Sequence, residues 1–102
     1  MEKYNLKESI DYSSDSIVSK QIYKKESTIT LFALDKNQTI SEHKAPFDAA
    51  VYIIEGKGEF KIGDEKIIAE ENDFFIMPAN ITHSVNAIEK FKMMLVMIKN
   101  DR

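Results

Sequence analysis

The fold is decided by two stretches, HKAPFDAAVYIIEGKGEF at residues 43–60 and NDFFIMPANITH at residues 72–83. Both combine the β-branched and aromatic residues typical of strands with the glycine, proline and asparagine typical of turns. His43 opens the first stretch and His83 closes the second, and the chain has no other histidine and no cysteine. Imidazole chemistry is therefore confined to these two positions.

Short strands are predicted along the whole chain outside the first residues. The β-branched and aromatic runs place them at 17–24, 28–34, 39–43, 50–55, 58–62, 65–69, 74–77, 82–87 and 90–98. Turn residues separate the runs, and no segment has the periodicity of a long helix. This pattern is typical of an all-β antiparallel sandwich or jelly roll.

A chain of 102 residues and 11.7 kDa is predicted to form one domain. Residues 1–15 are polar and weakly periodic, so we expect an N-terminal arm before a barrel at residues 16–102. The run at 91–98 is largely apolar in both of its alternating sets. We expect both faces of this strand to be covered, one by the barrel interior and the other by a partner sheet or subunit, and predict a homodimer.

Composition narrows the possible partners. The formal net charge is −3, the pI is near 5.4, and Arg102 is the only arginine. The sequence has no basic stripe of the kind that binds nucleic acid, and no apolar run long enough to cross a membrane. Neither nucleic acid nor a membrane is therefore expected as a partner. The lack of cysteine fits a reducing compartment, and a cytoplasmic protein is predicted.

The spacing of the two stretches resembles the motifs of the cupin family. The first family motif runs Gly, five residues, His-x-His, three or four residues, Glu, six residues, Gly. The second runs Gly, five residues, Pro-x-Gly, two residues, His, three residues, Asn. Aligned on Gly56 and Pro78, the resemblance covers about residues 37–87. It implies a double-stranded β-helix, a jelly-roll barrel with its site inside.

Three glycine positions of these motifs hold Asn37, Asn72 and Asn80. Asparagine tolerates the left-handed backbone region better than other non-glycine residues, so the turns should be retained. The metal-ligand positions are kept only in part. The second histidine position holds Ala45, the glutamate position holds Ala49, and the closing asparagine position holds Ala87.

The resemblance and strand alternation together predict a pocket inside the barrel. The residues expected to line it are His43, Ala45, Ala49, Val51 and His83. Alanine in place of two large ligands leaves space that would suit a small organic molecule. Under this interpretation the imidazoles act as hydrogen-bonding groups, and one of them could carry a proton near neutral pH.

A metal remains the alternative occupant. His43 and His83 could hold zinc, iron, manganese or nickel, but two ligands do not complete a site. The third ligand could come from water, from substrate, or from Asp48, Glu42 or Asn86. Strand alternation turns Glu42 outward, whereas Asp48 precedes the predicted strand and could turn inward, so Asp48 ranks first. The alternative, that both histidines are structural and bind no metal, is given the same weight as a metal site.

The methionines at positions 77, 93, 94 and 97 have two interpretations. Thioethers are ligands for soft metals, but methionine at strand spacing is far more often adaptable core packing. Core packing is therefore the interpretation preferred from the sequence.

Three functional hypotheses follow. The favoured one is a small-molecule-binding cupin with a degenerate metal site and an unknown ligand. The second is a metal-dependent enzyme, of the dioxygenase or isomerase type, that uses His43, His83 and a third ligand. The third is an accessory or regulatory protein that works through its dimer or partner surface.

Overall fold

The structure is a computed structural model that describes residues 1–99. Residues 100–102, which include Arg102 and the end of the expected barrel domain, lie outside the described residues. The elements are a 3-10 helix η1 (Leu6–Glu8) and the strands β1 (Ile17–Lys24), β2 (Thr28–Leu34), β3 (Thr39–His43), β4 (Asp48–Glu55), β5 (Lys57–Ile62), β6 (Glu65–Glu70), β7 (Phe74–Met77), β8 (His83–Ala87) and β9 (Phe91–Ile98).

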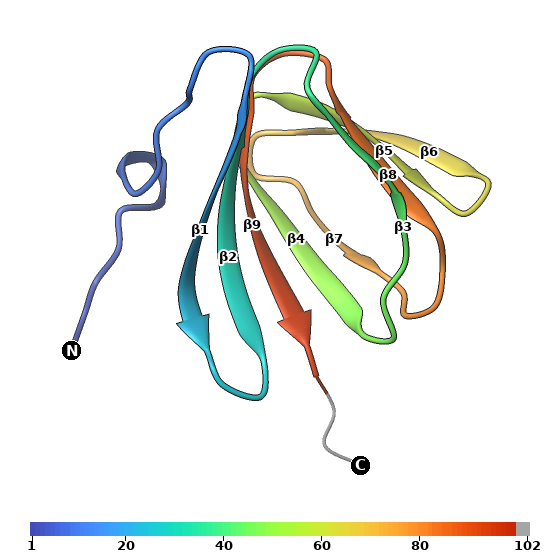
Figure 1. Ribbon diagram of the computed structural model, residues 1–102, viewed down its shortest axis with the longest axis horizontal. Coiled ribbons are helices and arrows are strands. Elements are labelled where there is room, and N and C mark those ends of the chain that lie inside the picture. The colour runs from blue at the N-terminus through green and yellow to red at the C-terminus, as the bar shows by residue number, and fades with distance from the viewer. Residues whose placement is uncertain (100–102) are drawn as a thin grey trace.

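The strands form two antiparallel sheets that face each other (Figure 1). One sheet has the order β1-β2-β9-β4-β7, and the other has the order β3-β8-β5-β6. The crossovers between the sheets are those of a jelly roll, which confirms the predicted all-β fold. Within residues 1–99, no helix is long and apolar enough to cross a membrane.

The strand positions agree with the sequence prediction to within two residues. The largest difference is in β4, which begins at Asp48 instead of residue 50. Asp48 pairs with Ile98 of β9, so it belongs to the sheet and its side chain follows the alternation of the strand. This small difference matters for the predicted metal site.

The main core fills the space between the two sheets. In β4 the alternate residues Ala49, Val51 and Ile53 face this core and are almost fully buried. Phe60 of the opposite sheet lies at the centre, with its ring centroid 4.9 Å from that of Phe75 and its edge-to-face geometry typical of aromatic pairs. The alternation predicted from the sequence therefore places one set of β4 side chains inside the barrel.

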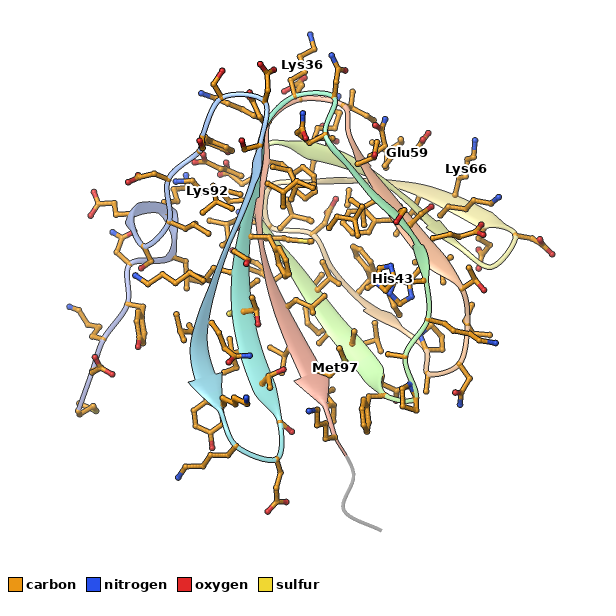
Figure 2. The ribbon with its side chains drawn as sticks, viewed as in Figure 1. Lys36, His43, Glu59, Lys66, Lys92 and Met97 are labelled. Carbon is orange, nitrogen blue, oxygen red and sulfur yellow. The ribbon has the colours of Figure 1, made fainter. Side chains whose placement is uncertain are left out.

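The N-terminal arm packs on the outer face of the five-stranded sheet. Ile10 of the arm is buried in a second apolar cluster, whose other buried members are Leu31, Ala33 and Ile54. Figure 2 shows Lys92 of β9 directed toward the arm, while His43 lies between the two sheets. The outer side of β9 is thus covered partly by the chain's own arm. The sequence predicted a partner sheet or subunit on this face. The arm supplies part of the cover, because residues 1–15 carry apolar side chains of their own, and a contact with a subunit stays a prediction.

The asparagine turns have the backbone predicted for them. Asn37, Asn72 and Asn80 have φ values of 71°, 71° and 62°, in the left-handed region. Gly56 has a φ of 87°, and a Cβ atom there would collide with the backbone of Lys90. Position 56 therefore requires glycine, whereas asparagine holds the left-handed backbone at the other three turns.

Candidate functional site

His43 and His83 meet across two paired strands. β3 and β8 are antiparallel neighbours, and the two histidines are direct partners in their register, next to an irregularity between Ile40 and His43. The ring centroids are 4.2 Å apart and the ring planes make an angle of 72°. His83 is buried, whereas His43 is exposed at the rim. The structure thus brings the two predicted imidazoles into contact.

Each imidazole is oriented by a backbone carbonyl two residues before it. His43 Nδ1 lies 2.8 Å from the Ser41 oxygen, and His83 Nδ1 lies 3.2 Å from the Ile81 oxygen. A carbonyl oxygen only accepts hydrogen bonds, so Nδ1 carries the proton in both rings and donates it. The Nε2 atoms then keep a free lone pair. Both rings are prepared to accept a hydrogen bond or to bind a metal through Nε2.

Burial keeps His83 neutral. Loss of water contact lowers the pKa of His83 below its ordinary value of 6.5, and the neighbouring His43 lowers it further. The bond to the Ile81 carbonyl acts in the opposite direction but is weaker. A neutral imidazole with a protonated Nδ1 is therefore the form expected at neutral pH, and it is the form that binds a metal or accepts a hydrogen bond.

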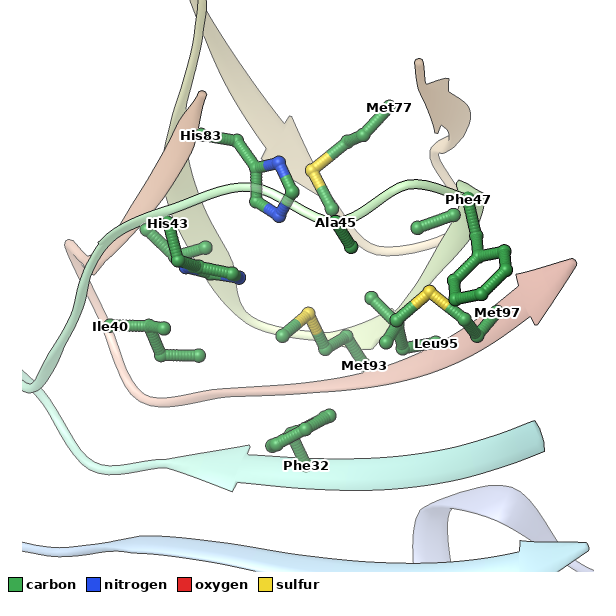
Figure 3. Close-up of a pocket in the computed structure, with 12 residues that line it drawn as sticks. Phe32, Ile40, His43, Ala45, Phe47, Met77, His83, Met93, Leu95 and Met97 are labelled. Atoms are coloured by element: carbon green, nitrogen blue, oxygen red, sulfur yellow. The ribbon is translucent and has the colours of Figure 1, made fainter. Parts of the chain in front are cut away.

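The imidazoles stand at the wall of an apolar pocket of about 120 Å³ (Figure 3). The other side chains of its lining are aliphatic, aromatic or thioether groups from both sheets and from the loop after β3. They are Phe32, Ile40, Ala45, Phe47, Ala49, Met77, Val85, Met93, Leu95 and Met97. An engineered apolar cavity of about 150 Å³ binds benzene, so this pocket suits a molecule of single-ring size.

Four of the predicted lining residues do line the pocket, namely His43, Ala45, Ala49 and His83. Val51 does not. It faces the same interior as Ala49 but lies deeper along β4, where it is fully buried in the main core. The alternation of β4 correctly gave its direction, but the depth of the pocket depends on the opposite sheet.

Asp48 does not join the histidines. Its Oδ1 accepts a hydrogen bond of 2.8 Å from the Ala79 backbone N–H, and strand alternation gives it the parity opposite to Ala49. Asn86 lies on a separate polar groove and Glu42 is exposed. In the described part of the chain, no three His, Cys, Asp or Glu side chains gather in a way that could hold a metal.

The apolar part of the pocket was missed by the sequence interpretation. β9 contributes Met93, Leu95 and Met97, which alternate along the strand. Their common inward direction was visible as a period of two, but their place at a cavity was not. Phe47 comes from the loop after β3, where no periodicity exists. Only the packing of the sheets and loops reveals that these residues surround a space.

The family model for the cupin domain matches residues 30–99. The chain belongs to the cupin family. This assignment agrees with the jelly roll and with the positions of His43 and His83 inside it. No match was found among curated proteins.

Solved structures similar to this cupin extend the comparison. A conserved protein of unknown function from Streptococcus pyogenes is 33% identical, with a TM-score of 0.92 over 99% of this chain and 90% of that one. A cupin 2 conserved barrel domain protein from Leptotrichia buccalis is 34% identical, with a TM-score of 0.90; the match covers 94% of this chain and 47% of that one. A cupin superfamily protein from Desulfitobacterium hafniense, at 22% identity and a TM-score of 0.86 over 89% of this chain and 84% of that one, supports the fold alone.

The side chains of this cupin do not fit the complete ligand set of the family motifs. Ala45 and Ala49 lie at the pocket where the motifs place a histidine and a glutamate, and neither alanine offers a ligand atom. A divalent ion there would have His43 and His83 but no carboxylate to offset its charge. Residues 1–99 therefore do not supply the full set of side-chain ligands for the metal site of the family.

Proposed function

We propose that this cupin binds a small, uncharged organic molecule in the pocket beside His43 and His83. The observation that carries the proposal is the combination of an apolar pocket with two Nε2 acceptors at its wall. Apolar walls with a few placed polar groups are typical of small-molecule sites. The metal-ligand set of the family motifs is incomplete, which favours binding of a small molecule over metal-dependent catalysis.

The chemistry of the wall selects the ligand. Both Nε2 atoms accept hydrogen bonds, so the ligand should donate one from a hydroxyl or N–H group. The volume of about 120 Å³ limits the ligand to about one ring. A carboxylate has no hydrogen to donate to the two Nε2 acceptors and would meet no lysine or arginine among the lining residues, so anions are disfavoured.

Phenol and toluene test this proposal because they have the same size and differ only in the donor. We expect phenol to bind more tightly, by about fivefold, since one hydrogen bond contributes about 1 kcal/mol. His43→Phe removes one of the two acceptors and should reduce this preference while leaving toluene binding in place. Ligand-detected NMR titration measures both affinities. Equal binding of the two compounds by the wild type, or binding of neither, would contradict the proposal.

A metal-dependent enzyme of the dioxygenase or isomerase type is the second candidate. It is favoured by the carbonyl bonds of both Nδ1 atoms, which leave Nε2 free as in metal-ligating histidines. Zinc, iron, manganese or nickel would need water or substrate as further ligands. Metal analysis of protein offered each ion, with His43→Ala and His83→Ala as controls, tests this candidate. Near-stoichiometric metal that both variants lose would favour it.

A homodimer is part of the same proposal. Phe74 and Ile76 lie on the edge strand β7 and are 62% and 49% exposed, and Ile98 of the same sheet is 45% exposed. Exposed apolar side chains on one sheet are suited to a contact with a second copy. Sedimentation of the wild type against Phe74→Lys tests the dimer. The cytoplasmic location, the accessory role and the boundary after residue 15 stay predictions.

A further inference from the structure

A polar groove lies on the outer face of the four-stranded sheet, on the side opposite to the apolar pocket. Figure 2 shows Glu59 and Lys66 on this outer side, whereas His43 lies between the two sheets. The groove has a volume of about 320 Å³, and polar side chains from all four strands, β3, β5, β6 and β8, line it. Strand alternation turns these side chains away from the core, because Phe60 and Val85 between them are buried in it.

The first row of side chains across this face contains two lysines. Ser84 of β8 pairs with Lys61 of β5, which pairs in turn with Lys66 of β6. Like charges directly opposite each other destabilise a sheet. Lysine on an edge strand such as β6 protects against aggregation, but β5 lies between β6 and β8, so this reason does not apply to Lys61. Within residues 1–99, no ion pair joins either lysine to a carboxylate. The pair is therefore suited to an anion.

The second row offers groups that bind hydroxyls. Thr39 of β3 and Glu59 of β5 pair with Asn86 of β8 from its two sides. Together they present a hydroxyl, a carboxylate and an amide, which between them donate and accept hydrogen bonds. In the part of the chain that the structure describes, none of these three side chains makes a hydrogen bond within the protein. Their hydrogen-bonding capacity is free for a ligand.

The charges of the two rows orient a ligand. The Lys61 and Lys66 ammonium groups together carry the charge that balances a phosphate monoester, which has nearly two negative charges at neutral pH. The Glu59 carboxylate lies two residues before Lys61 on the same strand, so it repels an anion from the second row and accepts hydrogen bonds from hydroxyls there. Two residues of a strand span roughly 7 Å, a distance that a short carbon chain covers.

We propose that this groove binds the phosphate monoester of a small polyol. The phosphate lies on Lys61 and Lys66, and the hydroxyls of the ligand lie on the row of Thr39, Asn86 and Glu59. The lining residues that the structure describes include no aromatic side chain, so a nucleobase would have no ring on which to stack. This site lies outside the barrel and takes an anion, whereas the pocket inside suits an uncharged molecule.

Glycerol 3-phosphate, inorganic phosphate and glycerol test the proposal, because the first compound has both kinds of group and each of the others has one. NMR titration of the ¹⁵N-labelled protein should show saturable shifts of the groove amides with glycerol 3-phosphate. Inorganic phosphate should bind about fivefold more weakly, which corresponds to the loss of about one hydrogen bond. Glycerol, which lacks the charge, should bind at least about tenfold more weakly.

The lysines have a matched control on the same hairpin. Lys61→Gln and Lys66→Gln should each weaken glycerol 3-phosphate binding by about fivefold, the size of one exposed charge pair, and the double variant should lose it. Lys57→Gln removes the same charge from a lysine that already has a partner, Glu70 at 3.5 Å, and that does not line the groove. This control should bind as the wild type does. Lys61→Gln and Lys66→Gln should need at least as much urea to unfold as the wild type, since each relieves a like-charge pair.

Glu59 gives a test of the second row. Glu59→Ala removes a negative charge near the lysines, so inorganic phosphate should bind more tightly than it does to the wild type. The same change removes an acceptor for hydroxyls, so the advantage of glycerol 3-phosphate over inorganic phosphate should decrease. An unchanged ratio of the two affinities would overturn the assignment of the hydroxyls to this row.

Three further results would overturn the proposal. One is a wild type whose groove amides show no saturable shift with glycerol 3-phosphate. Another is a Lys61→Gln/Lys66→Gln variant that binds glycerol 3-phosphate as tightly as Lys57→Gln does. The third is equal affinity of the wild type for glycerol 3-phosphate and inorganic phosphate. Phenol binding in the pocket should be the same in all these variants, so failure of one proposal does not decide the other.

Discussion

Lys92 and His83 are the two polar side chains that are buried among residues 1–99, each with 7% exposure, and they lie on opposite sides of the five-stranded sheet. The Lys92 ammonium donates to the Lys7 carbonyl oxygen, lies 4.0 Å from a Glu55 carboxylate oxygen and stands over the Tyr12 ring. His83 uses one ring nitrogen for the Ile81 carbonyl and turns the other face of its ring to an apolar pocket.

The difference teaches how to separate a structural polar group from a functional one. The donor capacity of Lys92 is used within the protein, so its environment explains it as the anchor of the arm. His83 retains an acceptor at the wall of a cavity, and this second nitrogen is the one that the proposed ligand would use. The exposed fraction does not distinguish the two residues, because it is the same for both. The number of their polar partners within the protein does distinguish them.

The largest effect on stability should come from the arm. Ile10→Ala removes a buried side chain from the cluster under the arm, and the free energy of unfolding should fall by about 2 to 3 kcal/mol. Phenol affinity should stay within about twofold of the wild type, because Ile10 is on the far side of the sheet. Urea unfolding measures the first quantity. Ile68→Ala, on an exposed position of β6, is the control and should change stability by less than about 0.5 kcal/mol.

A smaller loss should follow removal of one hydroxyl. Tyr12 donates a hydrogen bond of 2.8 Å to the Glu55 carboxylate, and burial raises the pKa of Tyr12 further above its usual range, so the hydroxyl remains protonated. Tyr12→Phe should cost about 1 kcal/mol in urea unfolding. Tyr4→Phe is the matched control, since the Tyr4 bond to Glu2 is 3.3 Å long and exposed. Equal effects of the two changes would show that the arm is not anchored by Tyr12.

Substitution of a pocket residue should lower ligand affinity and leave stability almost unchanged. His43→Ala changes an exposed residue at the rim and should alter the free energy of unfolding by no more than about 0.5 kcal/mol. The preference for phenol over toluene should weaken, because one of the two Nε2 acceptors is removed. The phenol and toluene titration checks the affinities and urea unfolding checks the stability, with Lys44→Ala as the neighbouring control. A variant that loses stability like Ile10→Ala would mean that His43 is structural.

The smallest effect is a dependence on pH. Folding lowers the pKa of His83 below 6.5, so the unfolded chain takes up the proton first as the pH falls. The contribution of neutral His83 is complete above about pH 6.5 and is lost progressively below it. The free energy of unfolding of the wild type should therefore decrease more between pH 6.5 and 5 than that of His83→Gln. NMR titration of the His83 ring gives the pKa directly, and a value above 6.5 would contradict this.

Much of the fold was predictable because it rests on local patterns. Alternation placed the nine strands to within two residues, and the asparagine turns have the predicted left-handed backbone at Asn37, Asn72 and Asn80. The two histidines were also identified, since no other imidazole competes with them. Asp48 ranked first as a third ligand because it was expected to precede the strand, and a strand start two residues earlier removes that reason.

The rest of the site depends on contacts between distant segments. Val51 and Ala49 share one face of β4, yet only Ala49 lines the pocket, whereas Val51 is fully buried in the main core. Phe47 and Met77 belong to segments thirty residues apart in the sequence, and both line one space. No periodicity contains this information.

By itself, the sequence determined the all-β class, the strand positions, the turns and the two imidazoles. These depend on backbone preferences and on side-chain alternation within a few residues, which every short segment carries with it. The tertiary structure alone decided that the arm covers its own sheet, that Asp48 stays apart from the histidines, and that methionines of β7 and β9 line the same pocket as the histidines. Those outcomes depend on how two sheets pack, a property that no segment has before its partner is in place.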